Sequence, residues 1–143
     1  MRMLRNVSVF LAMLILVTLA VSTVLLDIQR RLMAGGVFTS YFGWFSWGFA
    51  TFPLLLAALF LVAGVVQSWL MRTNNAALWA FALGACYTLL RLFFVRSWFA
   101  REHQPIEVLW AVIEMLVPPL AAWGGALLVA RSRRRELRNA TAP

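Results

Sequence analysis

The residues best suited to chemistry lie in the C-terminal half, where four charges interrupt two long apolar stretches. Arg91 and Arg96 come before the polar segment 101–104, and Glu107 and Glu114 come after it. An ionisable side chain inside a membrane is costly unless it is paired, hydrated or neutralised, so such residues mark ion pairs or proton and ion paths. These four residues form the candidate site, with a structural and a transport role both open.

Depth favours the pairing of Arg91 with Glu114. Arg91 follows Asn75 by 16 residues, and Glu114 precedes Arg131 by 17 residues. At 1.5 Å per residue, both lie roughly 25 Å from one boundary of a hydrocarbon core about 30 Å thick. Two antiparallel helices would therefore place this intramembrane charge pair at one level.

A second pair, Arg96 with Glu107, is predicted closer to the membrane interface. The same counting places these two residues nearly level, about one helical turn further out. Glu107 also follows Pro105, which suits the first turn of a helix, where a carboxylate is favoured by the helix dipole. A capping role for Glu107 therefore stands beside the pairing role.

The charged faces of these two stretches are also rich in small residues, which let membrane helices approach closely. Pro118 and Pro119 add a predicted kink, because each lacks the N–H that would bond the carbonyl of Glu114 or Met115. Arg91 has five N–H donors, and we expect it to bind both the carboxylate and a carbonyl freed in this way. The small residues are Ala77, Ala80 and Gly84 on one stretch and Ala111, Pro118, Ala121 and Gly125 on the other.

Other chemistry has little support in the residue types. His103 is the only histidine, so a zinc site would have to combine it with Glu102 or Glu107, which is a poor ligand set. Cys86 is the only cysteine, lies in an apolar stretch and is expected to be a small buried residue. The sequence contains no nucleophile–base or phosphate-loop pattern. It predicts no catalytic residue, metal or cofactor; a membrane enzyme using Glu107, Glu114 or His103 as acid or base is the weaker alternative.

The composition predicts the elements that would position these charges. The 143 residues are 63% hydrophobic and 13% charged, whereas soluble domains have about 45–50% apolar and 25% charged residues. We expect an all-α integral membrane protein, a single domain over residues 1–143. The expected spans of this four-helix bundle are 7–26, 50–71, 76–100 and 106–130, followed by a basic, frayed tail at 131–143.

The first of these stretches has a competing interpretation as a secretory signal peptide, with small residues at 20–22 as a cleavage site. The apolar run continues through Leu26, which favours a retained span.

Aromatic residues gather near the expected ends of the spans. Phe42, Phe45, Phe49 and Phe52 recur at helical spacing ahead of Pro53, and they could form a ligand-stacking platform. An interfacial belt is the favoured interpretation, because tryptophan and tyrosine are enriched where lipid meets water. The predicted interfacial tryptophans are Trp44, Trp47, Trp69, Trp98 and Trp110.

Arginine counting predicts the orientation. With both termini inside, eight arginines face the cytoplasm and four face the opposite side, which agrees with the positive-inside rule. We expect a bacterial inner membrane location with both termini cytoplasmic. The arginines cluster at the ends of apolar stretches and not on a soluble fold, which disfavours nucleic acid as a partner. The basic tail could also meet anionic lipid head groups.

The predicted function is a non-catalytic, multi-pass subunit or accessory protein of a larger membrane complex. Its partners would be the lipid bilayer and either another membrane protein or copies of the same chain. The alternative is a small oligomeric transporter or channel, with Arg91 and Glu114 lining the path.

Overall fold

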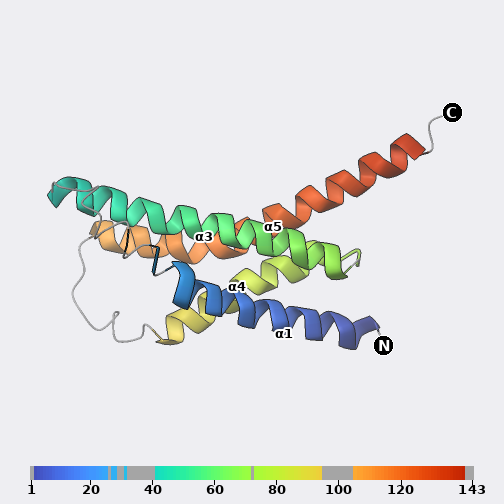
Figure 1. The fold of residues 1–143 in the computed structure, drawn as a ribbon, viewed down its shortest axis with the longest axis horizontal. Helices are drawn as coiled ribbons and strands as arrows, with labels where there is room; N and C mark the ends of the chain where they lie inside the picture. Colours follow the sequence, from blue (N-terminus) through green and yellow to red (C-terminus); the bar gives the residue numbers. More distant parts are fainter. Residues whose placement is uncertain are drawn as a thin grey trace.

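The computed structural model describes residues 2–25, 27–28, 31, 41–71, 73–94 and 105–140. Every regular element within these ranges is helical (Figure 1). The elements are α1 (Arg2–Ala20), which continues into the π-helical turn η1 (Val21–Leu25), then α3 (Tyr41–Met71), α4 (Ala76–Phe94) and α5 (Pro105–Ala140).

Four of these helices are long and apolar enough to cross a membrane, which confirms the predicted all-α fold with four such helices. They alternate in direction, so both termini and the short turn between α3 and α4 lie at one end of the bundle (Figure 1). We call this the terminal end and the other the distal end. The crossing-competent segments are Met3–Val24, Phe52–Met71, Ala76–Phe93 and Ala111–Leu137.

α3 ends at Met71 and α4 begins at Ala76, as expected, but α3 and α5 extend beyond their expected bounds. α3 begins at Tyr41, nine residues before the expected boundary at residue 50, and therefore contains Pro53 within the helix. α5 continues through Ala140, so the expectation of a frayed tail is wrong for residues 131–140. Arginine, leucine and glutamate are good helix formers, and they propagate the helix once the apolar stretch before them has nucleated it.

Helices α3, α4 and α5 form a tightly packed group in which glycines sit at the contact points. A side chain at Gly84 of α4 would collide with the backbone of Pro118 and Pro119 in α5. Gly64 of α3 lies in the same way against Ala122, and Gly125 of α5 lies against Leu61. With no Cβ at these sites, the backbones approach one another closely, as small residues allow in membrane helices.

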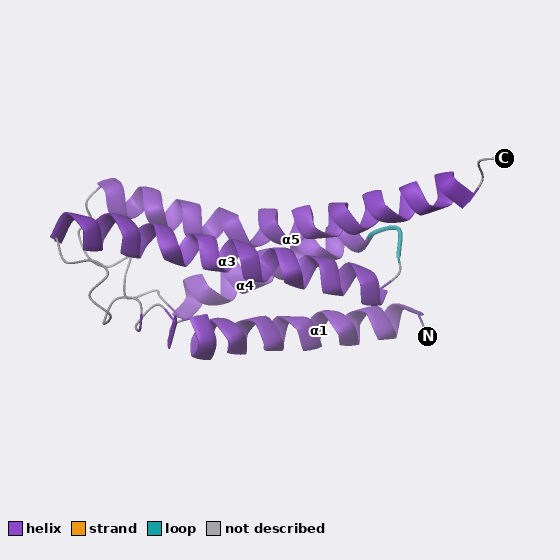
Figure 2. Ribbon diagram, turned by 45° about the horizontal axis from the view of Figure 1, so that its top comes forward, coloured by secondary structure: helices purple, strands orange, loops and turns teal. Residues whose placement is uncertain are grey.

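Helix α1 packs on this group through a single stripe. Met13 and Val17 of α1 and Val21 of η1 are the buried apolar residues of this stripe, and they recur at the spacing of one helix face. Phe10 adds an edge-to-face contact with Trp79 of α4, with ring centroids 5.5 Å apart. Only 17% of the apolar stretch of α1 is buried, so α1 lies at the edge of the bundle, as Figure 2 shows.

Candidate functional site: a charge pair between two helices

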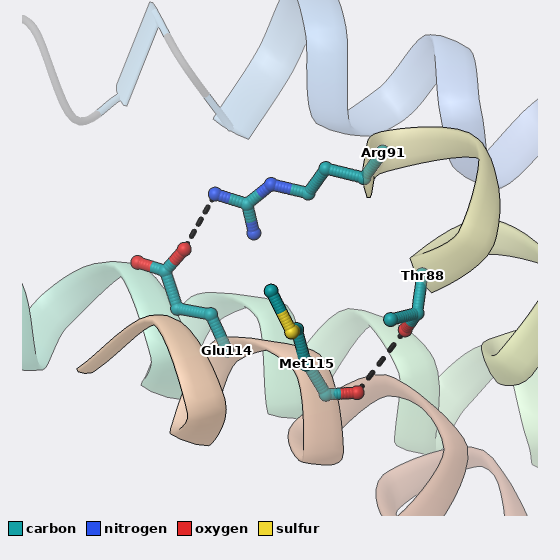
Figure 3. A network of polar contacts seen from close by, with 4 residues as sticks. All are labelled: Thr88, Arg91, Glu114 and Met115. Carbon is teal, nitrogen blue, oxygen red and sulfur yellow. Dashed lines mark hydrogen bonds and ion pairs between the residues drawn. The ribbon is translucent and has the colours of Figure 1, made fainter. Parts of the chain in front are cut away.

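Arg91 of α4 and Glu114 of α5 are in contact in the distal half of the bundle. The Arg91 Nη2 atom lies 2.5 Å from Glu114 Oε2 and donates a hydrogen bond to it (Figure 3). The side chains are 33% and 18% exposed. The structure thus brings together the two residues that depth counting places at one level, and it leaves both partly accessible.

A third helix supplies a second contact to the arginine. The Arg91 Cζ atom lies 5.1 Å from the ring centre of Phe52 in α3, and Phe52 itself is buried. A guanidinium over an aromatic face is attracted by the negative charge of the π system, and more so where water is scarce. Arg91 therefore joins α3, α4 and α5 at one point. Sequence reasoning placed Phe52 only in the aromatic belt.

Of the two carbonyls freed by the prolines, that of Met115 is bound by Thr88 and not by Arg91, which corrects the expectation from sequence. Pro119 removes the N–H that would bond the Met115 carbonyl. The Thr88 hydroxyl donates to this oxygen at 3.1 Å (Figure 3). Thr88 precedes Arg91 by three residues on the same face of α4, so its short side chain reaches α5 while the longer arginine extends past it.

The backbone approach that makes this contact possible starts one turn earlier. Gly84, Thr88 and Arg91 follow one another at spacings of four and three residues, so they share a face of α4. At Gly84 the backbone of α4 meets that of α5 beside Pro118, which is fully buried. The predicted small-residue face is correct here, but Gly125 packs against α3 and not against α4.

Among the remaining predicted site residues, the structure describes the side chain of Trp69 only. Arg96 and Trp98 lie outside the described residues. Trp44 and Trp47 fall in the first turns of α3, and Glu107 and Trp110 in those of α5, where the structure describes the backbone only. The Arg96–Glu107 pair therefore stays a prediction. Trp69 lies near the terminal end of α3 and is 61% exposed, as an interfacial tryptophan would be.

Two arginines at the terminal end bind backbone carbonyls of α3, which sequence reasoning did not anticipate. Arg5 of α1 donates from Nη2 to the Met71 carbonyl at 3.4 Å, and Arg133 of α5 donates from Nη2 to the Ser68 carbonyl at 3.2 Å. The last carbonyls of a helix have no partner within it and carry partial negative charge. One arginine from α1 and one from α5 thus cap the C-terminus of α3.

Buried polar side chains surround this cap. Asn6, Gln67 and Ser68 are all at least nine-tenths buried. Gln67 Nε2 donates to the Trp79 carbonyl at 3.3 Å. Gln67 Oε1, Asn6 Oδ1 and Ser68 Oγ have no hydrogen-bond partner among the described residues. The sequence signal for this polar cluster was the amide side chains of Asn6 and Gln67, which occupy otherwise apolar positions on two helix faces.

The described ranges contain no cluster of side chains that could hold a metal ion. Within 2–25, 27–28, 31, 41–71, 73–94 and 105–140, no three His, Cys, Asp or Glu side chains come together. Cys86 is a free thiol and is partly exposed, where the sequence suggested full burial. His103 lies outside the described residues. The chemical capacity of the described site is thus that of a single arginine–carboxylate pair.

Comparisons with protein-family models, with curated proteins and with solved structures find no match to this chain. The functional interpretation therefore depends on the geometry of the molecule. That geometry offers two possibilities: a charge pair that holds three helices together, and a carboxylate placed within a membrane-length bundle.

Proposed function

We propose that this chain is a multi-pass integral membrane protein without a catalytic role, which serves as a subunit or accessory protein of a larger membrane complex. Four crossing-competent helices with many exposed apolar side chains support the membrane placement. A soluble monomeric protein rarely exposes so much apolar surface to water.

The observation that carries the proposal is that Arg91 and Glu114 make their contacts within the bundle. The guanidinium binds the carboxylate of α5 and the Phe52 ring of α3, so both charges serve contacts within the bundle. Such a pair holds helices in register, since leaving either charge alone in a membrane would be costly. The outward faces, above all that of α1, are left for lipid or for the helices of a partner.

The proposed orientation has both termini in the cytoplasm of a bacterium, across its inner membrane. Arginine asymmetry supports it, and the shared position of both termini at one end of the bundle agrees with it (Figure 1). We expect a cysteine placed at Asn74, in a Cys86→Ser background, to react with a membrane-impermeant maleimide only after cells are permeabilised. Labelling of intact cells would reverse the orientation.

The subunit role is tested by native mass spectrometry after extraction of the full chain in a mild detergent. A complex with another membrane protein, or with copies of the chain in a fixed stoichiometry, is the expected result. A stable lone monomer, with no partner also after cross-linking in the native membrane, would contradict the proposal. The identity of a partner would then define the task of the complex.

The second candidate is a small oligomeric transporter or channel, and the partial exposure of the pair favours it. Glu114 keeps one carboxylate oxygen outside the contact with Arg91, and both side chains are partly exposed. Ion or proton flux in proteoliposomes that is lost in Glu114→Gln, while Glu107→Gln retains it, would establish this role. Absence of flux under every gradient tested would contradict the transport role and support a structural role of the pair.

A further inference from the structure

The last turns of α5 carry exposed arginines on the face directed away from the bundle. At 100° per residue, Arg131, Arg134 and Arg135 fall within an arc of about 100°. All three are exposed. Arg133 lies nearly opposite this arc, is half-buried and donates to the Ser68 carbonyl of α3. The contact at Arg133 therefore fixes which face the other three present. We call Arg131, Arg134 and Arg135 the arginine stripe.

The positive charge of the stripe is not neutralised within the described part of the chain. The ion pairs found there join Arg31 to Asp27 and Arg91 to Glu114, and neither involves α5 beyond its middle. Glu136 is the only acidic residue after Glu114, and it is exposed without an ion pair to the stripe. Three like charges on one face repel one another, so they favour an external anion.

The depth of the stripe matches the head-group layer. The uncharged stretch of α5 that follows Glu114 ends at Ala130, and the helix continues past the end of α3 (Figure 2). The stripe then lies between roughly 2 and 8 Å beyond that boundary, at 1.5 Å per residue. The head-group layer on each side of a bilayer is about 5–8 Å thick. The guanidinium groups thus reach the level of lipid phosphates.

We propose that the arginine stripe binds the head groups of anionic lipids on the side of the membrane where both termini lie. Guanidinium groups form two parallel hydrogen bonds to phosphate oxygens, which suits them to this ligand. Nucleic acid or an acidic protein would have to approach a stripe that begins within the lipid surface, so lipid is the favoured occupant. The proposal rests on the membrane placement given above, but not on which side is cytoplasmic.

The test compares the arginine stripe, which faces outward, with Arg133, which faces α3. The full chain is reconstituted in phosphatidylcholine bilayers, and the association of spin-labelled phosphatidylglycerol is measured relative to spin-labelled phosphatidylcholine. We expect the wild type to prefer phosphatidylglycerol and the triple variant Arg131→Gln/Arg134→Gln/Arg135→Gln to lose that preference.

Arg133→Gln is the control and should retain the preference, because that side chain faces α3. Replacement of the three stripe residues by lysine should preserve most of the preference, and 0.5 M salt should reduce it by screening.

Three outcomes overturn the proposal: no preference in the wild type, an unchanged preference in the triple variant, or equal loss in Arg133→Gln while its thermal stability is unchanged. Binding of RNA or of acidic peptides that depends on the stripe, without lipid selectivity, also overturns it. Resistance to carbonate extraction is recorded for each variant. Release of the wild type by carbonate refutes membrane placement, whereas absent selectivity in an inserted protein refutes only the lipid site.

Discussion

The distal and terminal ends of the bundle use arginine in different ways. In the distal half, Arg91 meets a carboxylate and an aromatic ring, and the nearby freed carbonyl is bound by Thr88. At the terminal end, Arg5 and Arg133 bind carbonyl groups of α3. The distal site is thus an ion pair between two helices, and the terminal site is a cap on the C-terminus of α3.

The difference extends to the groups around each site. Oxygens of Asn6, Gln67 and Ser68 at the terminal end have no partner among the described residues, and such groups are normally satisfied by water. The distal site has its charges and its freed Met115 carbonyl bound by side chains. We therefore expect substitutions at the distal site to cost more stability than those at the terminal site, where water can replace a lost partner.

The largest effect should come from reversing one charge of the distal pair. Arg91→Glu or Glu114→Arg alone should cost about 3–5 kcal/mol of stability, because it leaves like charges together in a poorly hydrated place. The double swap should recover part of this loss. Folded yield and thermal unfolding in detergent measure both. No recovery in the double swap would mean that each residue depends on other partners, which would favour transport or subunit contact.

A smaller but still large effect is expected at the backbone contact beside the pair. Gly84→Ala places a methyl group against the backbone of Pro118 and Pro119 and should cost about 1–3 kcal/mol through overpacking. Gly124→Ala is the matched control, because nothing lies within 4 Å of a Cβ there. The control should keep wild-type stability or gain slightly. Equal melting temperatures for the two variants would show that α4 and α5 are less closely packed than described.

Removal of the Thr88 hydroxyl should have a moderate effect. Thr88→Val keeps the shape but leaves the Met115 carbonyl without its donor, and hydrogen bonds between membrane helices contribute about 0.6–1.7 kcal/mol. Thr18→Val is the control, since the Thr18 hydroxyl bonds the Leu14 carbonyl of its own helix at 2.7 Å. Thermal unfolding should separate the two variants. A control as unstable as Thr88→Val would refute a special role for the freed carbonyl.

The smallest effect is expected at the terminal end. Gln67→Met removes the hydrogen bonds to the Trp79 carbonyl and the Met71 sulfur, and it also removes a buried oxygen without a partner. These changes oppose each other, so stability should stay within about 0.5 kcal/mol of wild type. A loss as large as that of Glu114→Ala, measured under the same conditions, would abolish the contrast between a tolerant terminal end and a costly distal site.

Sequence reasoning predicted the elements well and the contacts only in part. Long apolar stretches, short turns and charged ends are local features, so they indicate the number of helices and their alternating directions. Counting residues along the two antiparallel helices predicted that Arg91 and Glu114 lie at the same depth, because the rise per residue is the same in both helices. The extent of α3 and α5 was missed, because the aromatic segment before Pro53 was assigned to an interfacial belt and the polar basic tail was expected to fray.

Composition and spacing by themselves determined that this chain forms four apolar helices with Arg91 and Glu114 at matching depth, because helix rise is the same in every sequence. Only the tertiary structure decided which side chain binds which group. Thr88 and not Arg91 reaches the freed carbonyl, Gly125 faces α3 and not α4, and Arg133 turns inward while the arginine stripe faces out. These choices depend on the rotation of each helix about its axis, which is set by the packing of three helices at once and leaves no mark in a single stretch of sequence.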